Sequence, residues 1–187
     1  MMNLAVFASH NGSALDVIYT AIEKGELQFN LKLVISNNSD AKVLKKAKNY
    51  NIKHTVINAK LFESPDLVIF ELLKRENIAC VFLAGYMKKL SLLITRNFKV
   101  INSHPALLPK FGGNGMYGRF VHEAVIKNKE KVSGVTIHEV NENYDEGKII
   151  LQKSLEIHPN ETVEKLEERI KELEKSTILE GLQQCLN

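Results

Sequence analysis

The chain has 187 residues, of which 44% are hydrophobic and 25% are charged, and its formal net charge is +3. This composition predicts a single soluble globular domain with one substantial core. No apolar run reaches the length of a membrane span, and the N-terminal MMNLAVFASH lacks the basic lead of a secretory signal. The lysines are spread over helical segments, which argues against nucleic-acid binding. We therefore expect a cytoplasmic protein with neither a membrane nor a nucleic-acid partner.

The two cysteines, Cys80 and Cys185, have no CxxC spacing. We interpret both as free thiols, with Cys80 packed in an apolar strand, and we expect no metal site.

The first half of the chain alternates apolar runs with segments of helical period. Strands are predicted at residues 3–9, 31–36, 53–58 and 79–85, and helices at 13–25, 41–50 and 65–77. The strands are apolar on consecutive positions, which is typical of parallel strands covered by helices on both faces. Up to about residue 101, the pattern predicts an open, doubly wound α/β sheet.

The second half follows a different pattern. A strand ends in VINSHP and is followed by the glycine-rich FGGNGMYGR and a helix at 120–129. Strand-like runs at 133–140 and 148–157 predict an antiparallel hairpin, and a final amphipathic helix could be capped by Asn160 or Thr162. Because no linker or repeat separates these segments, we predict one catalytic domain over residues 1–187. Its N-terminal half, about 1–101, is nucleotide-binding-like, and its C-terminal half spans about 102–187.

The loop SHNGSALD, after the first strand, is the first candidate site. Gly12 permits a tight turn and Ser13 opens a helix, whose free amides favour an anion such as phosphate. An ordinary turn with Ser13 as the helix cap explains the local sequence equally well. The loop has neither GxGxxG nor a Walker lysine, so it would suit one monophosphate rather than a dinucleotide or triphosphate.

A strand end and a downstream loop form the second candidate site. Asn102 and His104 are two residues apart, so both side chains can face one cavity while Ser103 points elsewhere. An amide and an imidazole can stabilise an oxyanion, and a carboxylate from Asp145 beside His104 would favour the charged imidazole. Taken singly, His104 is also consistent with a structural loop residue and Asp145 with a residue that serves its turn. The serines lack the GxSxG pattern of a nucleophile.

Several segments together resemble the phosphoribosylglycinamide formyltransferase family. They cover essentially the whole chain and comprise NGS, FLAGYMKKLS, INSHPALLPKF, SGVTIHEVNENYDEG and RIKELEKSTI. The combination of NxHPxLLP with VTxHxVxxxxDxG is highly specific to folate-dependent formyltransferases. The resemblance implies transfer of a formyl group from 10-formyltetrahydrofolate to the amine of glycinamide ribonucleotide, in purine (IMP) biosynthesis.

The resemblance also implies roles for individual residues. Asn102 and protonated His104 would stabilise the tetrahedral oxyanion, and Asp145 would hold His104 charged and relay protons through water. The residues implied for substrate phosphate and ribose are Asn11, Gly12, Ser13, Ala14, Lys171 and Glu174. The residues implied for folate are Met87, Lys88 and Leu90, together with Asn102 and Asp145. The partners would be these small molecules, with 10-formyltetrahydrofolate as the co-substrate. The reaction would need no metal. The protein would be a monomer or a homodimer.

The chain departs from the family pattern in three places. His10 and Ala14 replace a glycine and an asparagine near the phosphate, and Lys88 replaces a usual arginine. The loop at 111–119 differs from the common one, so His122 has no aligned role, and we interpret the loop as a mobile lid. His138 matches a recurrent family histidine, but an inward strand residue can also be structural.

Other functions stay open at this point. The tRNA and sugar-nucleotide formyltransferases carry additional domains, and the formyltetrahydrofolate hydrolase has a regulatory domain before its catalytic half. A noncatalytic nucleotide-phosphate binding module is a further alternative, although it would leave Asn102, His104 and Asp145 without a shared purpose.

Overall fold

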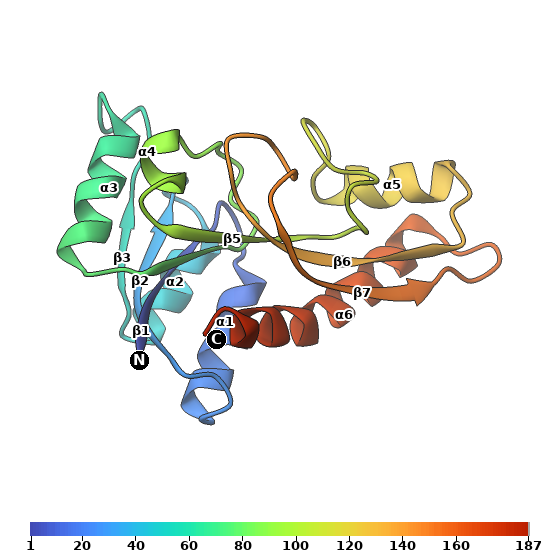
Figure 1. The fold of residues 1–187 in the computed structure, drawn as a ribbon, viewed down its shortest axis with the longest axis horizontal. Helices are drawn as coiled ribbons and strands as arrows, with labels where there is room; N and C mark the ends of the chain where they lie inside the picture. Colours follow the sequence, from blue (N-terminus) through green and yellow to red (C-terminus); the bar gives the residue numbers. More distant parts are fainter. Residues whose placement is uncertain (187) are drawn as a thin grey trace. The chain divides into compact units, whose positions relative to one another are not determined.

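The computed structural model describes residues 1–186, and the chain falls into two compact units, Met1–Ile101 and the part from Asn102 onward. The strands are β1 (Met2–Phe7), β2 (Phe29–Ser36), β3 (Lys53–Val56), β4 (Cys80–Leu83), β5 (Lys99–His104), β6 (Val132–Glu139) and β7 (Ile149–Glu156). The helices are α1 (Ser13–Glu23), α2 (Lys42–Asn49), α3 (Pro65–Arg75), α4 (Leu92–Thr95), α5 (Arg119–Lys127) and α6 (Val163–Gln184) (Figure 1). Hydrogen bonds order the strands β3-β2-β1-β4-β5-β6-β7. The predicted α/β class, parallel at first and antiparallel at the C-terminal hairpin, is confirmed.

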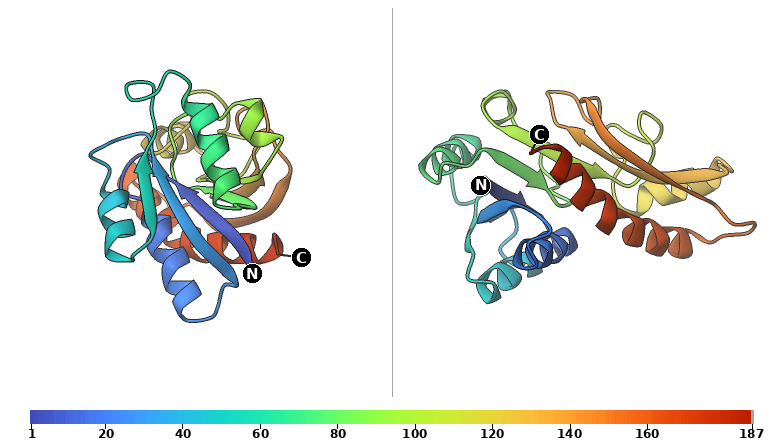
Figure 2. Two further views of the ribbon diagram at one scale, coloured as in Figure 1. Left: turned by 90° about the vertical axis from the view of Figure 1, so that its left-hand side faces the viewer. Right: turned by 60° about the horizontal axis from the view of Figure 1, so that its bottom comes forward.

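The first unit is built on a parallel sheet. β1 pairs in parallel with both β2 and β4, and β2 pairs in parallel with β3. Helices α1 and α2 lie on one face of these strands and α3 lies on the other (Figure 2). All four residues of β4 and the last four of both β1 and β2 are buried, as expected for strands covered on both faces.

Gly12 shapes the turn between β1 and α1. It is the N-cap residue of α1 and has a left-handed backbone with φ of 61°. A Cβ atom at this position would lie 2.3 Å from Cγ2 of Val43, on α2. The position therefore requires glycine both for its backbone angles and for the close approach of α2. Because Gly12 is the cap and Ser13 is the first helical residue, the interpretation of Ser13 as the cap is wrong.

The short helix α4 was not expected from the sequence. Four residues are too few to produce a helical hydrophobic period. Ile94 is its buried residue, and the backbone amides of Ile94 and Thr95 both donate to the carbonyl of Ser91.

The second unit contains an antiparallel hairpin packed against a long helix. β6 and β7 pair from Val132 opposite Glu156 to His138 opposite Ile149, with a register shift next to His138. α6 contacts both strands as well as α5, and Figure 1 shows it running along the hairpin. It buries one apolar face formed by Leu166, Ile170, Ile178 and Leu182. Of the two predicted caps, Thr162 is the one observed, since its side chain accepts a hydrogen bond from the amide of Lys165.

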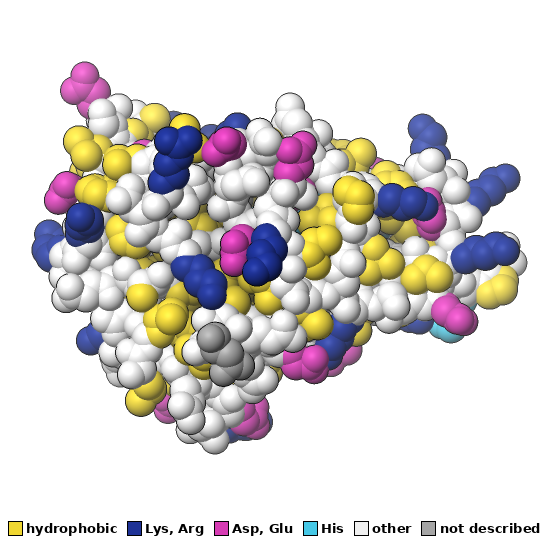
Figure 3. Space-filling model, in the orientation of Figure 1, with side chains coloured by type: hydrophobic (Ala, Val, Ile, Leu, Met, Phe, Trp, Pro, Cys, Tyr) yellow, Lys and Arg dark blue, Asp and Glu magenta, His cyan; other side chains and the backbone are white. Residues whose placement is uncertain are grey.

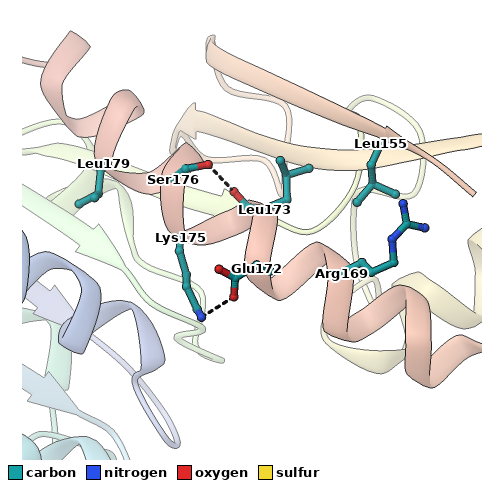
Figure 4. Close-up of a pocket in the computed structure, with 7 residues that line it drawn as sticks. All are labelled: Leu155, Arg169, Glu172, Leu173, Lys175, Ser176 and Leu179. Atoms are coloured by element: carbon teal, nitrogen blue, oxygen red, sulfur yellow. Dashed lines mark hydrogen bonds and ion pairs between the residues drawn. The ribbon is translucent and has the colours of Figure 1, made fainter.

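The surface of the second unit mixes hydrophobic and charged side chains (Figure 3). One pocket lies on β7 and α6 and is lined by Leu155, Arg169, Glu172, Leu173, Lys175, Ser176 and Leu179 (Figure 4). None of these seven residues is a predicted site residue. Over residues 1–186, no helix is both long enough and apolar enough to span a membrane.

Candidate functional site

The end of β5 presents its side chains in alternation, as the sequence predicts. The side-chain amide nitrogen of Asn102 lies 3.1 Å from Nε2 of His138, on β6. The hydroxyl of Ser103 instead donates to Glu174, on α6. His104 is only 3% exposed and contacts the loop that follows the strand. Asn102 and His104 thus belong to one polar cluster, and Ser103 belongs to another.

His104 has a polar neighbour at each ring nitrogen. Its Nε2 lies 2.7 Å from the carbonyl oxygen of Phe111, and a carbonyl only accepts, so Nε2 carries the hydrogen. Its Nδ1 lies 3.6 Å from Oδ2 of Asp145. The predicted proximity of His104 and Asp145 is therefore present in the structure.

Asp145 lies on the loop between β6 and β7 and has a left-handed backbone with φ of 57°, which aspartate tolerates better than most residues. Its Oδ2 accepts a hydrogen bond of 2.9 Å from the backbone amide of Gly113, and its Oδ1 lies 3.5 Å from Nε2 of His138. Burial alone would raise the pKa of Asp145, but His138, His104 and the Gly113 amide together lower it below its ordinary value. Asp145 is thus a carboxylate at neutral pH.

His138 connects the other members of the cluster. Its Nδ1 lies 2.8 Å from the carbonyl oxygen of Glu139 and donates to it, so Nε2 is the ring nitrogen that faces both Asn102 and Asp145. Nε2 accepts a hydrogen from the Asn102 amide where it carries a lone pair, and it donates to Asp145 where it carries a hydrogen. The sequence pattern gave His138 no definite role. The available signal was its inward position on a strand whose loop carries Asp145.

Opposing influences act on the pKa of His104. Burial lowers the pKa of His104, and the neighbouring His138 lowers it further, whereas Asp145 and the Phe111 carbonyl raise it. The net pKa lies below the ordinary value. Asp145 acts in the predicted direction, but burial outweighs it, because a charged imidazole loses its hydration inside the protein. That Asp145 keeps His104 charged stays a prediction, and in the protein without its substrates burial works against it.

The predicted phosphate loop lies in the first unit. Asn11 and Ser13 are exposed, whereas Gly12 and Ala14 are buried. Ala14 is 8% exposed and packs as part of the apolar face of α1.

The predicted folate segment also lies in the first unit and is tied to the end of β1. The amide of Met87 donates to Oγ of Ser9 over 2.7 Å, and Ser9 donates to Oδ1 of Asn37 over 2.6 Å. Met87 is 40% exposed, Lys88 is exposed and Leu90 is buried. Ser9 was missed as a supporting residue, although a buried serine at a strand end is a recognisable signal.

Lys171 and Glu174 lie on α6 and have different partners. Nζ of Lys171 lies 2.5 Å from Oε1 of Glu167, one turn earlier. Oγ of Ser103 lies 2.5 Å from Oε1 of Glu174. Burial raises the pKa of Glu174, and the Ser103 hydrogen bond and the charge of Lys171 oppose this rise. His122, on α5, is buried, and burial lowers its pKa.

Metal ligands are not grouped in the part of the chain that the structure describes. Over residues 1–186 there is no cluster of three or more His, Cys, Asp or Glu side chains that could hold an ion.

The fold and the polar cluster together define a class of protein. A doubly wound sheet that continues into an antiparallel hairpin carries a buried imidazole with a half-buried amide and carboxylate, the groups that stabilise an oxyanion in group transfer. The family model described as "Formyl transferase" matches residues 2–182. The chain belongs to the formyl transferase family, and the resemblance predicted from the sequence is confirmed.

Individual relatives agree with this assignment. The chain is 35% identical over 179 residues to the phosphoribosylglycinamide formyltransferase of Bacillus subtilis, covering 93% of this chain and 89% of that protein. It is 37% identical over 175 residues to the chloroplastic phosphoribosylglycinamide formyltransferase of Vigna unguiculata, covering 89% of this chain but 55% of that protein. The crystal structure of glycinamide ribonucleotide transformylase 1 from Geobacillus kaustophilus superposes with a TM-score of 0.92 at 31% identity, and each chain is fully covered, at 100%. The chain thus spans about half the length of the Vigna protein and most of the Bacillus protein.

Proposed function

We propose that this chain transfers the formyl group of 10-formyltetrahydrofolate to the glycine amine of N1-(5-phosphoribosyl)glycinamide, in de novo purine (IMP) biosynthesis. The observation that carries the proposal is the polar cluster of Asn102, His104 and Asp145, next to His138, in a chain of the formyl transferase family. Its similarity to proteins named phosphoribosylglycinamide formyltransferase selects the acceptor.

The reaction is direct transfer through a tetrahedral intermediate. The amine nitrogen of the ribonucleotide attacks the formyl carbon, a C–N bond forms, and the formyl oxygen becomes an oxyanion. The bond between the formyl carbon and N10 of the folate then breaks. The amine loses one proton and N10 gains one, so the products are formylglycinamide ribonucleotide and tetrahydrofolate.

Asn102 is suited to bind the oxyanion. Its amide nitrogen has two hydrogens, and Nε2 of His138 lies 3.1 Å away, where it can accept one of them. The second hydrogen is then oriented to donate to the formyl oxygen. Preorganised donors of this kind contribute about 10²–10³-fold to the rate when they face the developing charge.

His104 and Asp145 share the proton transfers. The developing oxyanion supplies a negative charge that the substrate-free site lacks, and this charge would raise the pKa of His104 toward protonation. Asp145 stays ionised and can accept a proton from the amine through water and return it to N10. The lowered pKa of the free imidazole therefore fits a group that charges only during the reaction.

The glycine-rich segment at 111–119 would act as a mobile lid. In the structure the Phe111 carbonyl accepts the Nε2 hydrogen of His104, and the Gly113 amide donates to Asp145. Moving this segment would release the Nε2 hydrogen toward the substrate. Hydrogen exchange of these amides should slow when both substrates bind. Equal protection with and without ligands would argue against the lid.

The binding roles follow the family resemblance. Asn11, Gly12 and Ser13 would bind the phosphate, and Ala14 would contribute packing. Lys171 would leave its ion pair with Glu167 and pair with the phosphate instead. Glu174 would accept hydrogen bonds from ribose hydroxyls. The residues proposed for folate are Met87, Lys88, Leu90, Asn102 and Asp145.

The remaining attributes of the protein are proposals of the same kind. The folate is a co-substrate, the reaction uses no metal, and the protein works in the cytoplasm as a monomer or homodimer.

A spectrophotometric folate assay tests the function. The purified protein is mixed with 10-formyltetrahydrofolate or 10-formyl-5,8-dideazafolate, with and without glycinamide ribonucleotide. We expect deformylation that requires the ribonucleotide and yields formylglycinamide ribonucleotide by mass spectrometry. Equal turnover without the ribonucleotide would identify a hydrolase, and silence from folded protein in both mixtures would contradict the proposal.

A further inference from the structure

Ser103 stands between two residues of the cluster but does not take part in it. Asn102 and His104 contact the cluster of His138 and Asp145, whereas the Ser103 hydroxyl crosses to α6 and lies 2.5 Å from Oε1 of Glu174. A serine hydroxyl has one hydrogen, and the carboxylate can only accept, so Ser103 is the donor. One three-residue strand end thus reaches both the reacting groups and a carboxylate on α6.

Glu174 depends on this donor. It is half-buried, and burial raises its pKa, which favours the neutral form. The Ser103 hydrogen bond is the largest influence that opposes burial, followed by the charge of Lys171. Hydrogen bonds to a charged group are worth roughly twice those between neutral groups. The contact also fixes the rotamer of the Glu174 side chain, because Ser103 belongs to β5 and holds the carboxylate from outside α6.

We infer that Ser103 is a positioning residue for substrate binding: it orients the Glu174 carboxylate so that this group accepts hydrogen bonds from the ribose hydroxyls of the ribonucleotide. The inference rests on the function proposed above. Oε1 receives the Ser103 hydrogen, and the carboxylate retains lone pairs on both oxygens for the vicinal diol. Ser103 therefore couples the position of the ribose to the strand that carries Asn102 and His104.

Substitutions at Ser103 separate positioning from a general structural role. Ser103→Ala removes the donor and should raise the KM for glycinamide ribonucleotide by about five- to twentyfold, the range expected when a hydrogen bond to a charged group is weakened. The KM for the formyl folate should not change. Ser103→Thr retains the hydroxyl on a residue that strands favour, and it should restore the KM to within about twofold of the wild type. Ser133→Ala is the matched control, because Ser133 is also a buried strand serine and its hydroxyl has no hydrogen-bond partner among the described residues.

The pH dependence of the KM for the ribonucleotide is a further test, because a change in packing alone would not alter it. Protonation of Glu174 should weaken ribonucleotide binding, so the KM rises as the pH falls. Since the Ser103 hydroxyl lowers the pKa of Glu174, Ser103→Ala should move this rise to higher pH, and Ser103→Thr should not. Glu174→Gln should raise the KM similarly and lose the rise with pH. Combining Ser103→Ala with Glu174→Gln should add little to either single change, as expected for one interaction.

The outcomes distinguish this inference from the function on which it rests. Wild-type protein that fails to use the ribonucleotide overturns both. Active wild type with an unchanged KM and pH dependence in folded Ser103→Ala overturns only the role of Ser103. Loss of binding in Ser103→Thr as well, with an unaltered melting temperature, would also overturn it. A Ser103→Ala variant that does not fold leaves Ser103→Thr and Glu174→Gln to decide.

Discussion

The two units differ in where their polar side chains lie. In the first unit, β1, β2 and β4 bury consecutive apolar residues, and polar side chains such as Ser9 and Asn37 contact one another where the strands end. In the second unit, His104 and His138 are buried within or at the end of strands and face Asp145. Isolated buried imidazoles would be costly, whereas a connected cluster satisfies them. The first unit is thus an apolar scaffold that carries loops, and the second unit buries the side chains that we propose for the chemistry.

The largest expected effect is that of His104→Ala. We expect kcat to fall by about 10²–10⁴-fold, the usual contribution of a positioned proton-transfer group, with the fold retained. The control is His54→Ala, since His54 is an exposed histidine on β3 of the first unit. Steady-state kinetics measure both variants. Near-wild-type turnover in His104→Ala would show that His104 is not a catalytic residue.

Asn102→Ala should be somewhat milder. It removes one oxyanion donor, and we expect kcat to fall by about 10²–10³-fold with a small change in KM. Asn30→Ala, at an exposed asparagine of β2, should leave kcat unchanged. A larger effect on KM than on kcat would mean that Asn102 binds the ground state instead of the oxyanion.

Asp145→Asn tests the electrostatics of the cluster. We expect a loss of about 10²-fold in kcat, because the amide cannot accept the proton. The Asp145 carboxylate raises the pKa of His104, so its removal lowers that pKa further. If protonated His104 is the active form, activity falls as the pH rises through its pKa. The variant's alkaline limb should therefore move to lower pH. An unmoved limb in the pH–rate profile would show that Asp145 does not influence His104.

The smallest effect is on stability and belongs to the first unit. Gly12→Ala should reduce the free energy of unfolding by about 1–3 kcal/mol more than Gly25→Ala does. Both glycines have positive φ, but a Cβ at Gly12 would lie 2.3 Å from Val43, whereas at Gly25 no atom lies within 4 Å. Urea denaturation measures the difference. Equal losses would show that α2 shifts to accept the added methyl group.

Sequence patterns predicted local features of both units well. The consecutive apolar runs identified the parallel strands, and the final amphipathic period identified α6, because these patterns report burial directly. Alternation along β5 placed Asn102 and His104 together and sent Ser103 elsewhere, as the hydrogen bonds confirm. The four residues of α4 and the cap of α1 were not recovered, since neither depends on a periodic pattern.

The sequence by itself determined the fold class, the family and the residues at the strand ends, because period, punctuation and motif spacing are properties of the chain. Only the tertiary structure decided how the cluster is connected. It made His138 the link between Asn102 and Asp145, gave Ser103 the partner Glu174, and lowered the pKa of His104. Burial and hydrogen-bond direction depend on neighbours that are distant in sequence, and no local pattern contains them.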